Sequence, residues 1–447
     1  MRKIFSFLLT NLLSNILLSL LVSFVSLCFL PSVSFSASST TTDITIQGAG
    51  KRFPIAVTSI CNQTSHNLEP DKTIISNLDV SGYFNVLNPE TYIESKGKCD
   101  DSSFAYSDWS IIGAEGLVKG VALNEGGQIK VKMYLHDVVR QGVVVAKEYK
   151  ISSPAQISTV ANRFSNVILE YFTGTSSFFG SQIAFSGRVG RFKELFLMNA
   201  NGTDIRQVTN DRGLVLSTSW SPTGSDLIYT SYRNRAPDLF RYSLVNRRLL
   251  QLTTGNALEI GGQFSPDGNT ILYSRTRGSA ADLILADLSG KTIRNVLVEG
   301  GIINVSPSWS PDGKEIVFCS NRGGGPQIYR MSSSGANIKR VSFVSSNYCT
   351  SPAWSPVGDK LTFVCRAEGR FQLFVTDVDG SNAQQLTTYG NNEDPSWSPD
   401  GRYIAFASTF GSSRVFNIAV IKSDGSNLRQ LTFSSTGYTD PAWGPVE

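Results

Sequence analysis

The chain has 447 residues, of which 41% are hydrophobic and 17% are charged, and its formal net charge is +4. This length predicts about three domains, or one large repeat array with additions. With 39 Gly and 17 Pro the chain is not of low complexity, and the lack of a long basic block argues against nucleic-acid binding. The two histidines, His66 and His136, lie in the first third, which excludes a histidine-based metal or Ser-His site in the remainder.

The first 36 residues have the pattern of an export signal. Arg2 and Lys3 precede an apolar run over residues 4–30, Pro31 breaks the run, and small residues follow at 34–37. A run of this length can also span a bilayer. Several Asn and Ser residues interrupt it, however, which favours a cleaved signal peptide (1–36) over a membrane anchor. We therefore expect an exported protein.

The cysteines after the signal segment suggest disulfides, because export leads to an oxidising compartment. No Cys-x-x-Cys pair occurs, so we predict neither a metal site nor a cofactor. Cys61 and Cys99 are candidates for one bridge. Cys349 and Cys365 flank a predicted hairpin turn and can face each other, although a register shift of one residue would place them on opposite faces. The remaining thiol, Cys319, is expected to be a buried apolar filler.

A small α/β domain is predicted over residues 37–172, beginning with a polar arm at 37–47. His66 is expected in a polar loop and His136 on a strand, and both are interpreted as ordinary side chains. Gly82 is the predicted stop of the first helix. The apolar patterns predict strands at 54–58, 110–114, 128–134 and 142–146, and helices at 70–80 and 157–171.

Self-similarity dominates the chain over residues 173–447. An aromatic anchor, usually followed by Ser-Pro-Asp-Gly, recurs every 43 to 46 residues. Each anchor is followed by two β-rich runs, an Asp-Gly type turn and a short Gln-x-Thr run, which makes four strands per unit. Four strands in such a period are typical of a propeller blade. The anchors are Trp220, Phe264, Trp309, Trp354, Trp397 and Trp443.

The two ends of the array complement each other. The first unit begins at Ile183 with the pattern of a second strand, and the last unit ends with an anchor strand at 438–443. We therefore predict that the C-terminal strand completes the first blade and closes a ring of six blades. The anchor strand is predicted to be the innermost edge strand, where proline is tolerated, and the aromatic anchor is interpreted as packing between blades.

A candidate binding site follows from this ring. The residues three before each anchor are predicted to encircle one mouth of the channel, with small side chains leaving it open and acids giving it one negative sector. Glu393 lies beside this set and Glu259 on another loop of the same face. Such a mouth suits a basic residue of a partner or a cation, although each acid taken singly is as well explained as a solvated loop residue. The six residues are Ser217, Gly261, Ser306, Ser351, Asp394 and Asp440.

Other motifs do not indicate a catalytic, phosphate-binding or calcium-binding site. No Gly-x-Ser-x-Gly elbow is present. Residues 290–292 resemble the end of a phosphate-binding loop, and residues 377–380 resemble a fragment of a calcium loop, but both are better explained as hairpin turns. We therefore predict no catalytic residues.

At this point the sequence resembles the TolB family, the periplasmic proteins of the bacterial Tol-Pal system. The resemblance rests on the signal segment, the order of the domains, the Trp-Ser-Pro-Asp-Gly repeat, and the segments 51–57 and 81–85 in the first domain. It implies a non-catalytic, monomeric adaptor that binds the lipoprotein Pal at the propeller mouth and the inner-membrane protein TolA through its N-terminal region. Other outer-membrane proteins are further candidate partners. The system supports outer-membrane integrity and constriction during cell division.

Two other function classes remain open. An exported propeller enzyme would be a lyase, which commonly uses a histidine-bound metal, or the gate of a peptidase, which would need a hydrolase domain. The C-terminal repeat contains no histidine. A carbohydrate- or peptidoglycan-binding propeller would present aromatic side chains at the mouth, and the six mouth positions carry none.

Overall fold

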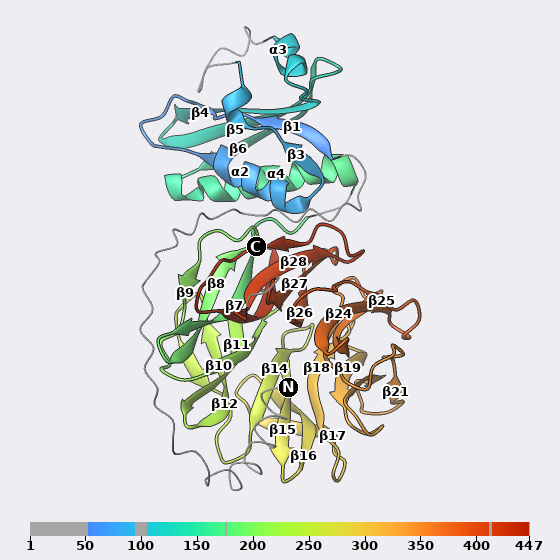
Figure 1. Ribbon diagram of the computed structural model, residues 1–447. Coiled ribbons are helices and arrows are strands. Elements are labelled where there is room, and N and C mark those ends of the chain that lie inside the picture. The colour runs from blue at the N-terminus through green and yellow to red at the C-terminus, as the bar shows by residue number, and fades with distance from the viewer. Residues whose placement is uncertain (1–51, 94–104, 175–176, 411–413, 447) are drawn as a thin grey trace, which may run out of the picture. The chain divides into compact units, whose positions relative to one another are not determined.

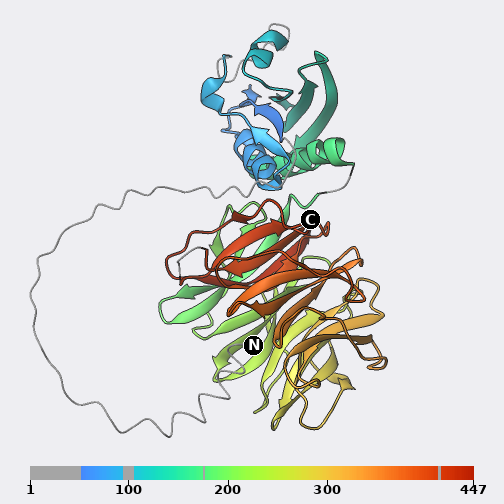
Figure 2. The same ribbon diagram turned by 45° about the vertical axis from the view of Figure 1, so that its right-hand side comes forward.

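The computed structural model describes residues 52–93, 105–174, 177–410 and 414–446. All of them belong to one compact unit, Gln47–Glu447. In this unit a small α/β region precedes a ring of β-sheets (Figures 1 and 2). The predicted signal peptide and polar arm lie outside the described residues. Within the described part, no helix combines the length and apolar character needed to span a bilayer.

The α/β region is a sheet with the strand order β3-β1-β4-β5-β6, against which α2 and α4 pack. Pro70 opens α2, where its fixed φ suits the first turn, and Gly82 ends the helix in a left-handed conformation at φ +67°. Val160, Phe164 and Ile168 of α4 are buried in the core, whereas Tyr171 near the end of the helix is 46% exposed. The elements are β1 (Phe53–Val57), β2 (Cys61–Asn62), α2 (Pro70–Ser81), β3 (Phe84–Val86), α3 (Tyr106–Ile111), β4 (Gly116–Glu125), β5 (Gln128–Asp137), β6 (Gly142–Ile151) and α4 (Ile157–Thr173).

One predicted strand is wrong. Residues 110–114 end helix α3 and form the following turn, and the strand of this region is β4, which begins at Gly116. Trp109 is the residue of α3 that is buried, where it packs edge-on against Tyr92 at a ring distance of 5.0 Å. Ile111 is 77% exposed, so the apolar pair at 111 and 112 does not mark a strand inside the sheet.

Six four-stranded antiparallel sheets follow, each with the anchor strand first in its order, as predicted. The sheets are β30 (Tyr438–Val446), β7 (Ser181–Val189), β8 (Phe192–Asn199) and β9 (Arg206–Gln207); β10 (Val215–Trp220), β11 (Asp226–Asn234), β12 (Ala236–Ser243) and β13 (Leu249–Gln251); β14 (Glu259–Phe264), β15 (Thr270–Arg277), β16 (Ala280–Asp287) and β17 (Thr292–Leu297); β18 (Asn304–Trp309), β19 (Glu315–Ser320), β20 (Gln327–Ser332) and β21 (Lys339–Arg340); β22 (Cys349–Trp354), β23 (Lys360–Ala367), β24 (Arg370–Asp377) and β25 (Gln384–Gln385); and β26 (Asn392–Trp397), β27 (Tyr403–Ser408), β28 (Asn417–Lys422) and β29 (Arg429–Gln430).

The C-terminal strand closes the ring. β30 pairs antiparallel with β7, with Trp443 opposite Ile183. The anchor strands contact one another in the cyclic order β10, β14, β18, β22, β26, β30 and back to β10. The predicted fold class is therefore confirmed: a small α/β region and a six-bladed propeller that is closed by the end of the chain.

The repeated motif is explained by contacts between blades. In the turn after Phe264, the Ser265 hydroxyl accepts a hydrogen bond from the backbone N–H of Thr270 at 3.0 Å and donates one to the Asp267 carboxylate at 2.5 Å. The turn glycine then lies against the preceding blade. A Cβ added to Gly358, for example, would lie 3.3 Å from the ring of Pro311. Serine thus recurs because it closes the turn, and proline and glycine recur because each turn packs on the previous one.

Two of the tryptophan anchors connect neighbouring blades through their indole groups. The indole Nε1 of Trp397 donates to the carbonyl of Ala353 at 3.1 Å, and that of Trp220 donates to the carbonyl of Ala442 at 2.9 Å. In both pairs the acceptor belongs to the preceding inner strand. At these two positions the anchor therefore ties one blade to the next.

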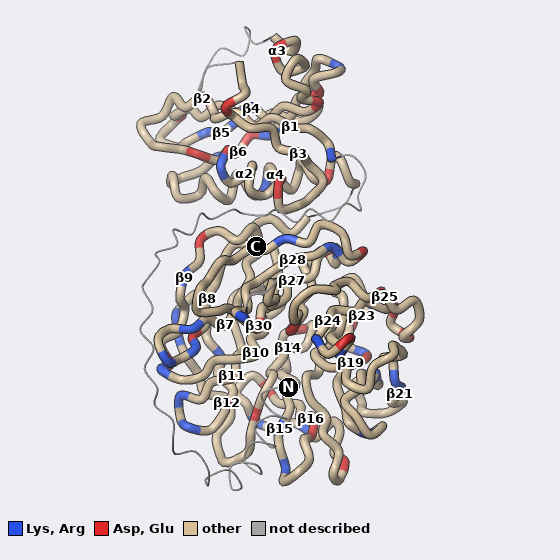
Figure 3. Tube along the Cα trace, in the orientation of Figure 1, with Lys and Arg blue, Asp and Glu red and all other residues tan. Residues whose placement is uncertain are grey.

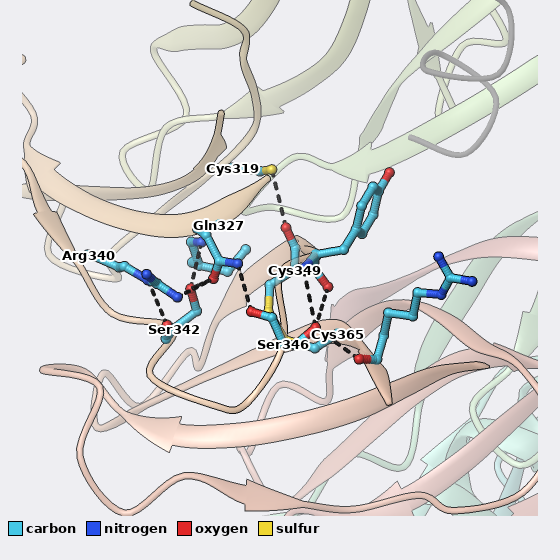
Figure 4. The surroundings of a disulfide bond; sticks show 10 residues. Cys319, Gln327, Arg340, Ser342, Ser346, Cys349 and Cys365 are labelled. Carbon is cyan, nitrogen blue, oxygen red and sulfur yellow. Dashed lines mark hydrogen bonds between the residues drawn. A yellow bond between two sulfur atoms is a disulfide. The ribbon is translucent and has the colours of Figure 1, made fainter. Parts of the chain in front are cut away.

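The predicted pairing of Cys349 with Cys365 is confirmed by a disulfide between β22 and β23 (Figure 4). The two residues are direct partners in the strand register. Cys319 is buried, as expected, and its thiol donates a hydrogen bond to the carbonyl of Cys349 at 3.4 Å. Cys99 lies outside the described residues, so the pairing of Cys61 with Cys99 stays a prediction.

Candidate functional site: a ring of axial bulges

The six predicted mouth positions share one backbone conformation. In every inner strand the register shifts just before the anchor, which marks a β-bulge. The residue three before the anchor takes a φ between +50 and +72° in all six strands. Each of these residues is half-buried. Because the six blades have the same topology, the bulges form one ring at one end of the axis, which we call the axial bulge ring: Ser217, Gly261, Ser306, Ser351, Asp394 and Asp440.

This conformation explains the small and polar residue types. Only Gly enters the left-handed region without penalty, and Asp and Asn tolerate it better than bulky or β-branched residues. An open mouth, which the small side chains predict, does not account for the bulge. The sequence does contain a signal for the bulge. One position of the repeat carries only Ser, Gly or Asp, although a regular strand favours residues of high β-propensity there.

The acidic members come from neighbouring inner strands, β26 and β30. Asp394 on β26 accepts a hydrogen bond from the Ser351 hydroxyl of β22 at 3.4 Å, so two members of the ring touch across blades. Asp440 on β30 accepts one from the Thr439 hydroxyl at 2.5 Å. Glu393, next to Asp394, is half-buried. The structure therefore brings Ser351, Asp394 and Asp440 into one sector of the ring.

A lysine that the sequence analysis missed accompanies Asp440. The ammonium of Lys193 on β8 lies 3.9 Å from the Asp440 carboxylate and donates to the Thr439 hydroxyl at 2.6 Å. Its side chain is only 16% exposed. Lys193 offsets part of the negative charge of the sector. No sequence signal could have found it, because strand pairing brings it there from 246 residues away.

Glu259 differs from the other acids of the predicted site. It is 2% exposed, and the guanidinium of Arg275 donates to its carboxylate at 2.6 Å. Glu259 also contributes, after burial, to raising the pKa of the nearby Asp238 carboxyl. Its carboxylate is thus engaged inside the blade, whereas Asp394 and Asp440 are half-buried at the ring.

The other candidate motifs lie where the sequence analysis expected them. Residues 377–380 form a turn, in which Asp379 accepts the backbone N–H of Ser381 at 2.9 Å. His66 is exposed in a loop, whereas His136 is buried on β5 beside the Tyr106 hydroxyl, 3.0 Å from its Nδ1. Within the described ranges, no three His, Cys, Asp or Glu side chains form a group that could hold a metal ion.

Comparison with known proteins identifies the family. The family model for the TolB β-propeller domain matches residues 169–447, and the model for the TolB amino-terminal domain matches residues 42–144. The chain belongs to the TolB family. Among curated relatives, the Tol-Pal system protein TolB of Syntrophus aciditrophicus is 33% identical over 48% of this chain and 50% of its own length. That of Syntrophotalea carbinolica is 30% identical over 34% of this chain and 36% of its own length.

These matches span about half or less of the relatives' own length. A solved structure extends the likeness in fold. The crystal structure of TolB from Acinetobacter baumannii aligns with a TM-score of 0.76 and 23% identity, covering 89% of this chain and 97% of that one. The TolB fold thus comprises both the α/β region and the propeller described here.

Proposed function

We propose that this chain is a non-catalytic periplasmic adaptor of the Tol-Pal system, exported by its first 36 residues. In this proposal the axial bulge ring binds a Pal-like peptidoglycan-associated lipoprotein, and the N-terminal region, including the arm at 37–47, engages a TolA-like inner-membrane protein. The adaptor would connect layers of the envelope, supporting outer-membrane integrity and constriction at division. The family membership and the names of the relatives support the assignment to Tol-Pal.

One observation carries the binding site. Asp394 and Asp440 stand at equivalent bulges of adjacent inner strands, half-buried on a rigid ring end. Half-buried carboxylates are screened less by salt than fully exposed ones, and fixed carboxylates attract basic side chains of a partner specifically. Each bulge also turns its side chain out of the regular strand alternation, which is a common role of bulges beside binding sites.

The rival functions find less support at this ring. A carbohydrate-binding propeller would offer aromatic rings for stacking, whereas the ring positions carry Ser, Gly and Asp. Hydrolysis by a covalent mechanism would need a nucleophile beside a base. Ser351 instead donates to Asp394 across a long hydrogen bond, and a carboxylate alone is a weak base for a hydroxyl.

A pull-down from envelope extract of the producing cells tests the proposal. Immobilised chain should recover a Pal-like lipoprotein, and the double variant Asp394→Asn with Asp440→Asn should not. Asparagine removes the charge and still tolerates the left-handed backbone. The matched control is Asp204→Asn, an exposed aspartate at φ +57° in the turn between β8 and β9.

The same experiment separates the two partners. A chain that lacks residues 37–47 should keep the Pal-like lipoprotein and lose the TolA-like protein. Recovery of the lipoprotein by the double Asn variant at the wild-type level would refute the axial site, and recovery of the TolA-like protein without the arm would refute the role of the arm.

A further inference from the structure

A group of arginines faces outward at the end of the propeller that carries the axial bulge ring. Arg188 and Arg191 border the turn between β7 and β8, Arg212 lies in the loop between β9 and β10, and Arg235 forms the turn between β11 and β12. All four are exposed. Figure 3 shows basic positions gathered on the loops beside β7, β10 and β11, on the left of that view. We call these four residues the arginine surface.

A backbone hydrogen bond and an ion pair hold the three segments together. The backbone N–H of Lys193 donates to the carbonyl of Gly213 at 2.9 Å, which joins the first segment to the second. The guanidinium of Arg233 lies 3.3 Å from the Asp211 carboxylate, which joins the second to the third. The arginine surface therefore spans two adjacent blades as one fixed arrangement.

The acids of these loops point inward. Glu194 is 1% exposed, and its carboxylate accepts the backbone N–H groups of Asp211 and Arg212, both at 2.8 Å. The Asp211 side chain is 5% exposed and accepts the Ser231 hydroxyl at 2.7 Å. Among the described residues, no carboxylate forms an ion pair with a member of the arginine surface. Negative charge is thus buried and compensated locally, while positive charge faces the solvent.

Two members of the arginine surface have a left-handed backbone. Arg212 and Arg235 adopt φ values of +51 and +75°. In the corresponding turns of the blades on either side of Arg235, the left-handed residues are Gly190 and Gly278. Arginine is disfavoured in this region relative to glycine, so the Arg235 turn keeps a costly residue where both neighbouring blades have glycine.

We propose that the arginine surface binds an acidic, Asp- and Glu-rich segment of a protein partner. This goes beyond the proposed function, because none of its members belongs to the axial bulge ring. Guanidinium groups bind carboxylates through paired, directional hydrogen bonds. The Arg191 guanidinium stacks on the Phe192 ring at 4.9 Å, which limits its freedom before binding. Guanidiniums presented on several joined turns suit a specific peptide better than a fluid lipid surface, for which unspecific positive charge suffices.

The test uses the mature chain and a fluorescein-labelled, glutamate-rich peptide, with fluorescence anisotropy at low salt. The double variant Arg212→Gly with Arg235→Gly should weaken binding by at least about fivefold. Because glycine relieves the strained backbone, the urea midpoint of this double variant should equal or exceed that of the wild type. A second variant, Arg188→Gln with Arg191→Gln, should also weaken binding at positions without such strain.

Arg247→Gly is the matched control. Arg247 is exposed and left-handed at φ +57°, but it lies in the turn between β12 and β13, at the other end of the blade. It should change the affinity by less than about twofold. Unchanged peptide affinity in both double variants, or an equal loss in the control, would overturn the proposal. Arginine-dependent binding to phosphatidylglycerol vesicles without binding to the peptide would overturn it as well, in favour of a lipid surface.

Discussion

The indole Nε1 of Trp443 donates a hydrogen bond to the Ser181 hydroxyl at 2.8 Å across a sequence separation of 262 residues. Trp443 is 7% exposed and packs edge-on against Phe178 at a ring distance of 5.1 Å. This pair joins the last strand of the chain to the first strand of the propeller. It also places Asp440 in the axial bulge ring, since Asp440 lies on the same closing strand.

Trp443→Phe should therefore destabilise the chain more than the same change at another anchor. Trp309→Phe is the control, because the Trp309 indole N–H finds no acceptor among the described residues. Both changes remove similar volume, but only the first removes a buried hydrogen bond. We expect Trp443→Phe to lower the free energy of unfolding by about 1–2 kcal/mol more than Trp309→Phe, measured by urea unfolding. Equal losses would show that the indole bond does not secure the closure.

The left-handed bulges predict an unusual order of tolerance at Ser306, where φ is +53°. Ser306→Val should cost about 1–2 kcal/mol of stability, because a β-branched side chain clashes in this region. Ser306→Gly should change stability by less than about 0.5 kcal/mol, although glycine usually weakens strands. The urea midpoints of the two variants measure this difference in stability. If the valine variant were as stable as the glycine variant, the left-handed conformation of Ser306 would be contradicted.

The disulfide between Cys349 and Cys365 should contribute substantially to stability, since it closes a loop with a sequence separation of 16. Replacing both cysteines by alanine should lower the free energy of unfolding by about 3 kcal/mol. Cys319→Ala serves as control for the loss of a buried sulfur without a bridge, and it should cost about 1 kcal/mol. If the double variant lost no more stability than the control, the bridge would not constrain the unfolded chain.

The buried thiol of Cys319 should be inert in the folded chain. Burial raises its pKa from the ordinary value of 9.0 to about 12, so the reactive thiolate is scarce at neutral pH. Iodoacetamide at about pH 8 should leave Cys319 unmodified until urea unfolds the chain, as read by mass spectrometry. Because the folded state holds the proton more tightly, this group's contribution to stability is complete below pH 9 and is lost as the pH rises toward 12. Rapid alkylation of Cys319 in the native chain would contradict the burial of its thiol.

The repeat made the propeller predictable from the sequence. Two irregular elements of the α/β region, strand β4 and helix α3, were not predictable in the same way. The anchors and their turns carry the blade geometry in the sequence itself, because turn residues such as Ser265 and Gly358 have few substitutes. Strand β4 escaped prediction because Lys119, a charged residue that is 4% exposed, interrupts its apolar pattern. Helix α3 escaped prediction because its short apolar stretch includes the exposed Ile111.

The candidate site was predictable in position but not in conformation or charge balance. Equivalent places in the repeat identified the residues that share the bulge, such as Ser351 and Asp394, which the structure joins by a hydrogen bond. The burial of Glu259 beside Arg275 and the approach of Lys193 to Asp440 depend on strand register. Register follows from packing of the whole sheet, which a single repeat position does not encode.

Isothermal titration of the mature chain with the purified periplasmic domain of a Pal-like lipoprotein from the same cells tests the proposed binding site most directly. We predict that the variant Asp394→Asn with Asp440→Asn binds at least about tenfold more weakly than the wild type. Asp204→Asn should bind like the wild type. Equal affinities of the wild type and the double variant for the lipoprotein domain would contradict the axial bulge ring as the binding site.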